Sequence, residues 1–222
     1  SASMVFSAEK WKYKPALTSS PNMTIPVVRL FIEYAEKTTN TKNPALLYLE
    51  RSQSESSPSQ LCLPGGKVND THASAIDREL QEEVGFKPPK NHSVRTPLYL
   101  FSQEPNQGYR EDFFQVGLDN RWNPPPKEYV RSSLNEESAD AHVLTLEESL
   151  KRDGIAYAND VAHFYYAVRN LNREEYTNPD HELDFYTNLI SWQLNGTIPN
   201  PITIPSHHSV TQQKDLQKYL AD

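Results

Sequence analysis

Three glutamates lie close together in the run Arg78–Phe86, at spacings that bring them to one side of a helix. Glu79 and Glu83 are four residues apart, and Glu82 follows Glu79 by three residues. Like charges at such spacings repel by a few tenths of a kcal/mol, and anions near a helix C-terminus also oppose its dipole. The pattern therefore favours a bound cation, and Mg²⁺ is the ion that combines carboxylate ligands with substrate phosphates.

A short apolar strand and a glycine turn precede these glutamates. Leu61–Pro64 reads as the strand, and Gly65–Gly66 allows the backbone to turn tightly before a helix begins. Asp70 or Thr71 can cap the N-terminus of this helix, and Gly85 suits the left-handed position after its last turn. The order of the elements is therefore strand, glycine turn and acidic helix.

The segment LPGGKVNDTHASAIDRELQEEVGF resembles the signature of the Nudix hydrolases. In that family, a glycine and a separate glutamate precede the pattern arginine-glutamate-apolar-any-glutamate-glutamate-any-glycine-apolar, and Arg78–Phe86 matches this second part at every fixed position. In the first part, the position of the separate glutamate falls on Asp70. The stretch between Gly66 and Arg78 is also two residues shorter than the pattern. We therefore expect Asp70 to cap the helix and not to reach an ion.

The resemblance implies a role for each residue of the signature. Glu79 would be both a metal ligand and a candidate base, Glu82 and Glu83 would be ligands, and the Gly65 carbonyl would donate a further oxygen. Arg78 would orient Glu79 through a charge-assisted hydrogen bond. The implied cofactor is Mg²⁺ or Mn²⁺.

Four more residues are candidates outside the acidic run. Glu137 lies in the acidic segment Glu136–Ser138, where the resemblance implies a late metal ligand or a base that activates water; an ordinary loop acid is the alternative. Lys67 follows the glycines, and Tyr109 lies beside a loop where an aromatic ring can stack on a base, so both are candidate substrate-binding residues. His72 could contact phosphate, although a surface position is the simpler interpretation.

The rest of the chain reads as an α/β protein. Strands are predicted at residues 27–34, 45–50, 94–101, 112–118 and 141–146, and further helices at 147–152, 155–172 and 180–194. The Ser-rich stretch 52–60 and the three prolines at 124–126 mark loops. By resemblance, the fold is a Nudix-type α/β/α sandwich around a mixed, curved sheet.

A chain of 222 residues fits one domain with appendages and can bury most of its apolar surface without disulfides. We expect an N-terminal arm at 1–24, a Nudix core at 25–153 and a C-terminal helical extension at 154–222 that packs on the core. The arm contains Trp11 and Tyr13, which would pack on the body or on a partner. The aromatic residues of the extension predict that it selects the substrate or forms a subunit interface, and coverage of the sheet is the simpler alternative.

Composition limits the compartment and the partners. The single cysteine, Cys62, excludes an internal disulfide and agrees with a reducing intracellular compartment. That compartment would be the cytoplasm, or an organelle such as the mitochondrion if a targeting segment was removed. The net charge of −7 argues against a generally basic nucleic-acid surface. No apolar stretch approaches the roughly 20 residues that cross a bilayer, so no membrane is expected among the partners.

By resemblance, the reaction is the divalent-cation-dependent hydrolysis of a diphosphate linkage in a nucleoside diphosphate joined to another group. Candidate substrates are nucleoside triphosphates, nucleotide sugars, dinucleotides and the 5′ triphosphate end of RNA, and the sequence does not choose among them. The alternative is a Nudix-fold subunit that binds a nucleotide or an RNA 5′ end within a larger complex, with weak or no hydrolysis. A protein partner or a second copy would then contact the N-terminal arm and the C-terminal helices.

Overall fold

The computed structural model describes residues 24–34, 45–86, 97–106, 108–116, 124–151 and 182–204. Nearly all of the predicted arm, the predicted helix at 155–172 and the first residues of the predicted strand at 94–101 lie outside these ranges. The division of the chain at residues 24 and 153 therefore stays a prediction.

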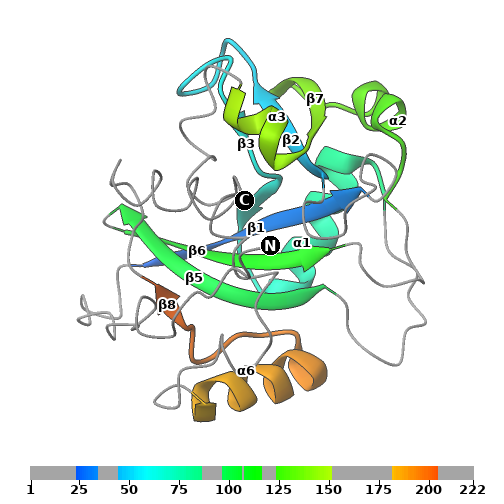
Figure 1. Ribbon diagram of the computed structural model, residues 1–222. Coiled ribbons are helices and arrows are strands. Elements are labelled where there is room, and N and C mark those ends of the chain that lie inside the picture. Colours follow the sequence, from blue (N-terminus) through cyan, green and yellow to red (C-terminus); the bar gives the residue numbers. More distant parts are fainter. Residues whose placement is uncertain are drawn as a thin grey trace, which may run out of the picture.

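Within the described residues, eight strands form a mixed sheet at the centre of the fold (Figure 1). The strands are β1 Ile25–Tyr34, β2 Ala45–Arg51, β3 Leu61–Cys62, β4 Gly65–Lys67, β5 Leu98–Asn106, β6 Tyr109–Val116, β7 Ser138–Leu144 and β8 Thr203–Ile204. Their order is β3-β2-β1-β6-β5-β8, with β4 paired to β1 and β7 paired to β2. Strand β1 runs parallel to β6 and antiparallel to β2 and β4, which makes the sheet mixed.

The described helices are α1 His72–Glu79, α2 Lys127–Ser132, α3 Leu146–Lys151 and α6 Glu182–Asn195, and α1 continues into the π-helical turn η3 Leu80–Val84. None of them is long and apolar enough to span a bilayer. The sequence did not predict α2, β4 or β8. Each has at most six residues, which is too short for an apolar repeat to become visible.

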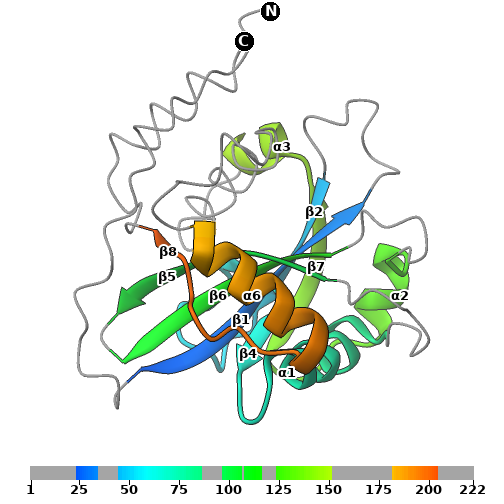
Figure 2. The same ribbon diagram turned by 90° about the horizontal axis from the view of Figure 1, so that it is seen from below.

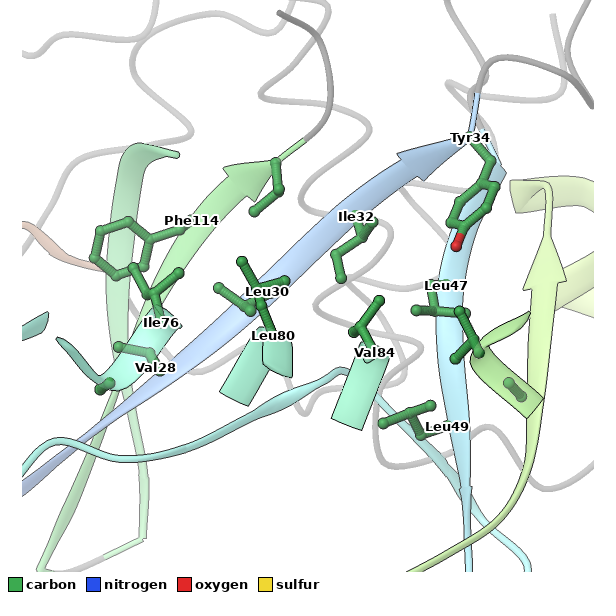
Figure 3. Packing of buried hydrophobic residues seen from close by; sticks show 14 of the residues in the cluster. Val28, Leu30, Ile32, Tyr34, Leu47, Leu49, Ile76, Leu80, Val84 and Phe114 are labelled. Atoms are coloured by element: carbon green, nitrogen blue, oxygen red, sulfur yellow. The ribbon is translucent and has the colours of Figure 1, made fainter. Parts of the chain in front are cut away.

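One face of the sheet buries the apolar side of α1 and η3 (Figure 3). The helical residues are Ile76, Leu80 and Val84, and the strand residues opposite them are Val28, Leu30 and Ile32. The helical set recurs every four residues and the strand set every two, as each element requires to present one face. Full burial of such a side chain stabilises the fold by about 1.5–3 kcal/mol.

Helix α6 covers the same face beside α1 (Figure 2). Trp192 is 1% exposed, and its ring lies 5.0 Å from that of Phe114, centroid to centroid. Its Nε1 donates a hydrogen bond to the carbonyl of Pro97 at 2.8 Å. After the helix, β8 pairs in parallel with β5. Trp192 therefore covers the sheet, which was the simpler alternative for the C-terminal aromatic residues.

The opposite face of the sheet carries a second apolar layer. Phe31 alternates with the residues that face α1, and its ring stacks on Phe113 at 5.5 Å, while Phe113 stacks on Phe101 at 4.9 Å. On β2, Tyr48 also points to this side, and Ser149 of α3 lies close to its hydroxyl. Helices therefore lie on both faces of the sheet, which confirms the predicted sandwich.

Candidate active site

The glycine turn is a strand of the sheet, and both of its glycines are required by close contacts. Strand β4 pairs with β1 so that Gly65 lies opposite Arg29 and Gly66 opposite Val28. A Cβ on Gly65 would lie 1.9 Å from the carbonyl oxygen of Val28, and a Cβ on Gly66 would lie 1.9 Å from Oε1 of Glu79. The turn therefore allows the sheet on one side and a carboxylate on the other to approach the backbone directly.

The structure separates the three glutamates of the acidic run. Glu79 and Glu83 are each 8% exposed, whereas Glu82 is exposed. The backbone N–H of Gly65 donates a hydrogen bond to Oε2 of Glu83 at 2.9 Å. The run ends in the π-helical turn η3, where the N–H of Gly85 bonds to the carbonyl of Leu80. Two of the three carboxylates therefore turn inward to the glycines, and π turns of this kind are frequent at functional sites.

Burial and mutual repulsion disfavour the charged forms of the two inward carboxylates. Burial and, to a lesser extent, the charges of Glu79 and Glu137 raise the pKa of Glu83 to about 8, although the hydrogen bond from Gly65 and the charge of Arg29 oppose this rise. Burial also raises the pKa of Glu79, although the hydrogen bond and charge of Arg78 oppose this rise. The positive charges and hydrogen-bond donors of the described residues therefore do not offset the cost of burying these two anions, as expected at a site that binds a cation.

Arg78 connects the acidic helix to the glycine turn. Its Nη2 donates hydrogen bonds to the carbonyl of Lys67 and, at 3.2 Å, to Oε1 of Glu79. This is the contact that the resemblance implied, and its importance for activity stays a prediction.

Of the two residues that the sequence offered as caps of α1, Asp70 and Thr71, the structure selects Thr71. Thr71 is the N-cap, because its Oγ1 accepts a hydrogen bond from the backbone N–H of Ser74 at 3.1 Å. Asp70 is exposed one residue earlier. The prediction that Asp70 caps the helix is therefore wrong, because the residue directly before the first helical residue is the one whose side chain reaches that N–H.

A cleft of about 330 Å³ opens beside the glycine turn. Five residues predicted from the sequence line it: Gly65, Lys67, Glu83, Tyr109 and Glu137. The segment around Glu137 is tied to the Ser-rich loop by a hydrogen bond from the N–H of Ser52 to the carbonyl of Glu137 at 2.9 Å. Segments distant in the sequence thus meet at one cleft.

Two ion pairs in the cleft wall were not predicted. Nε of Arg29 lies 3.0 Å from Oε2 of Glu111, and Nη2 of Arg51 lies 3.4 Å from Oε2 of Glu55. The only available signal was a charged residue inside an otherwise apolar strand, as at Arg29. Its partner could not be identified, because Glu111 is 82 positions away in the chain.

His72 lies in a buried polar network at the start of α1, so the prediction of a surface position is wrong. Its Nε2 lies 2.7 Å from Oδ2 of Asp112, and its Nδ1 accepts a hydrogen bond from the N–H of Ile198 at 3.3 Å. The N–H of Ile198 points to Nδ1, so Nε2 is the ring nitrogen that faces Asp112 as a donor. The adjacent N–H of Ala73 donates to the carbonyl of Gly196 at 3.0 Å. The C-terminal segment therefore holds the start of the acidic helix.

Asp112 is the anion at the centre of this network. It accepts hydrogen bonds from His72, from Ser102 at 2.5 Å and from Nε and Nη2 of Arg110 at 2.9 and 3.1 Å. Burial by itself would raise the pKa of Asp112, but the hydrogen bonds from His72 and Arg110 and the charge of Arg110 lower it.

The carboxylates at the glycine turn and in the adjoining cleft fit a hard divalent cation by their chemistry. Glu79 and Glu83 supply oxygen donors with raised pKa values beside the glycine turn, and Glu137 lies within electrostatic reach of both. Within the described ranges, no three carboxylate, imidazole or thiol side chains are arranged as a ready-made metal site. The chemistry of this donor set therefore suits such an ion.

Comparison with known families identifies the fold. A model of the NUDIX domain matches residues 38–166, which is more than half of the chain. The chain belongs to the Nudix family. The matched range includes the glycine turn, the acidic helix and Glu137, and it ends before α6. The family assignment made from the acidic run is therefore confirmed.

Several solved structures are similar to this Nudix chain. The MutT protein from Methanosarcina mazei Go1 is 21% identical, with a TM-score of 0.41 over 66% of this chain and 92% of that chain. A MutT structure from a study of Aliivibrio salmonicida and Vibrio cholerae is 17% identical, with a TM-score of 0.45 over 66% and 98% of the two chains. The MutT NUDIX hydrolase from Burkholderia pseudomallei is 13% identical, with a TM-score of 0.43 over 67% and 98%. No curated protein matches the chain.

Proposed function

We propose that the protein is a pyrophosphohydrolase that cleaves a diphosphate linkage in a nucleotide or nucleotide derivative with the help of Mg²⁺ or Mn²⁺. The observation that carries this proposal is the pair of buried carboxylates, Glu79 and Glu83, against the glycine turn. Their pKa values are raised although Arg78 and Arg29 act to lower them, so the nearby positive charge does not offset burial, and this site adjoins a cleft of nucleotide size.

The protein residues would share the work of binding the ion and moving a proton. Glu79, Glu82, Glu83 and the Gly65 carbonyl would hold the ion, which supplies charge neutralisation at the phosphates and acidifies water when bound. Glu79 or Glu137 would accept the proton of the attacking water. Arg78 would keep Glu79 oriented through the hydrogen bond described above. Lys67, exposed at the cleft, would contact a phosphate, and Tyr109 would contact the nucleoside.

Chromatographic separation of the nucleotide products formed from a broad panel of compounds tests this proposal. The panel contains nucleoside triphosphates, nucleotide sugars, dinucleotides and 5′-triphosphorylated RNA, each with Mg²⁺ or Mn²⁺. We expect turnover of at least one compound, complete loss in excess EDTA, and recovery when the cation is restored. Undiminished turnover in EDTA would refute the proposal.

A second candidate is a Nudix-fold subunit that binds a nucleotide or an RNA 5′ end with weak or no hydrolysis. Two observations favour it: Asp70 is exposed where the family pattern has a glutamate, and the described residues contain no ready-made metal site. Binding of a panel compound without turnover under any cation would support this candidate. The free thiol of Cys62 is consistent with a reducing intracellular compartment for either function.

A further inference from the structure

We propose that the part of the cleft wall formed by β1 and β6 binds the nucleobase of the substrate and selects guanine. This inference rests on the function proposed above and adds a base specificity to it. The residues that carry it are Arg29, Glu111 and Tyr109, all of which line the cleft.

The register of the strands places these residues in a row that leads away from the glutamates. Gly65, which binds Glu83, lies opposite Arg29 on β1. Strand β6 is the neighbour of β1 on the other side. Along β6, Glu111 comes two residues before the position that pairs with Arg29, and Tyr109 comes four residues before it. Four residues of strand span about 13 Å. A nucleotide with its phosphates at the glutamates would therefore extend its base towards Tyr109.

Tyr109 offers a surface for stacking at the far end of this row. It is the one aromatic residue among the described residues of the cleft wall, and it is 40% exposed. An aromatic ring can stack on any of the bases, because every base has a flat π-face. Tyr109 can therefore hold a base without choosing which one, so selectivity must come from a neighbour with directed polar groups.

The ion pair of Arg29 and Glu111 supplies such groups. The two side chains are only 20% and 14% exposed, and the side chain of Glu111 has no other hydrogen bond or ion pair among the described residues. The pair presents hydrogen-bond donors and a carboxylate acceptor side by side. Guanine presents the complementary set, with N1–H and N2–H₂ for the carboxylate and O6 for the guanidinium. Adenine and cytosine each present a single amino group beside ring acceptors, so they leave part of the carboxylate unpaired.

A phosphate on Arg29 is the competing interpretation of the same residues. It is disfavoured because Oε2 of Glu111 lies 3.0 Å from Nε of Arg29, so a phosphate at that guanidinium would lie next to a carboxylate. A neutral base with donors and acceptors meets no such repulsion. A base site at this pair predicts different turnover for nucleotides with different bases, whereas a phosphate site predicts equal effects on all of them.

The test compares GTP, ATP, UTP and CTP as substrates of the full chain with Mg²⁺, together with Glu111→Gln and the matched control Asp140→Asn. Asp140 also pairs with an arginine, Arg131, but lies outside the cleft wall. We expect the unmodified protein to favour GTP by about tenfold or more in kcat/KM. Glu111→Gln should remove most of this preference while ATP turnover changes less than about threefold, and Asp140→Asn should leave the ranking unchanged.

Each outcome is decisive. Absence of a guanine preference, or an equal loss for all four nucleotides in Glu111→Gln, would overturn the inference, and the equal loss would indicate a phosphate or structural role for the pair. If the protein hydrolyses none of the four, the proposed function fails for triphosphates. Calorimetric binding of GTP against ATP then tests the base site separately, and equal affinities would overturn it.

Discussion

Two clusters of charged side chains lie at opposite ends of the helix formed by α1 and η3. In one cluster protein groups stabilise the buried carboxylate, and in the other they do not. At the start of the helix, the anion Asp112 receives hydrogen bonds from His72, Ser102 and Arg110, and its pKa is lowered. At its end, Glu79 and Glu83 repel each other, and their pKa values are raised.

The difference indicates what each cluster is for. A buried charge whose hydrogen-bonding capacity is filled by protein groups holds segments together, and here it connects α1, β6 and the C-terminal segment. A pair of buried like charges weakens the folded state unless a ligand supplies the opposite charge. The first cluster therefore maintains the helix, and the second is expected to act through the ion that it binds.

Asp112→Asn should break the first cluster with the largest effect on stability. The amide cannot accept all of the donors that surround Asp112, and removal of one partner from a buried charge network costs about 3–5 kcal/mol. Urea unfolding should show this loss, while turnover per folded molecule is largely retained. Asp140→Asn, at the more exposed pair with Arg131, should cost less than about 1 kcal/mol. Equal losses in both variants would contradict the distinction between a buried network and a surface pair.

Glu83→Gln should have the converse effect on the second cluster. It removes a repelled anion but keeps an acceptor for the N–H of Gly65, so stability should not fall. Turnover should drop by about a hundredfold, which corresponds to about 2.7 kcal/mol of transition-state stabilisation. Glu147→Gln, at an exposed position of α3, is the control and should leave turnover unchanged. Full activity of Glu83→Gln in steady-state assays would remove Glu83 from the ion site.

The two clusters should also respond to pH with opposite signs in metal-free protein. The pKa of Glu83 is raised from 4.5 to about 8, so its contribution to stability is complete below pH 4.5 and is lost as the pH rises towards 8. The pKa of Asp112 is lowered from 3.8, so its contribution is present above that pH and is lost as the pH falls through the lowered value. One such group changes stability by at most about 1.4 kcal/mol per pH unit.

Urea titrations in EDTA across this pH range would measure both effects. The fall of stability between pH 4.5 and 8 should be smaller in Glu83→Gln, and saturating Mg²⁺ should reduce it in the unmodified protein. A pH profile identical in the two proteins would show that Glu83 is not the titrating group.

Thr71→Ala tests the helix start by itself and should have the smallest effect. Loss of the cap to the N–H of Ser74 should cost about 1 kcal/mol of stability. The Mg²⁺ concentration that gives half-maximal turnover should not change, because the carboxylates lie at the other end of the helix. The neighbouring change Asp70→Ala should affect neither quantity, and a shifted Mg²⁺ midpoint in Asp70→Ala would show that this carboxylate acts on the ion after all.

The sequence by itself determined the elements whose information is local. Alternating apolar residues located β1, and a short apolar run located β2. The fixed spacing of Arg78, Glu79, Glu82, Glu83 and Gly85 identified the acidic helix and the family. Gly85 has a φ of 75° as its position after the helix required. Such features were predictable because periodicity and backbone preference act between residues that are neighbours in the chain.

Tertiary structure decided which of these residues meet. It paired Arg29 with Glu111, turned His72 inward to Asp112, and left Glu82 exposed while its neighbour Glu83 was buried. It also brought the N–H groups of Ala73 and Ile198 to partners on segments more than a hundred residues apart. Contacts of this kind depend on the order and register of strands, and one charged residue in a strand carries no information about the partner that the register will place beside it.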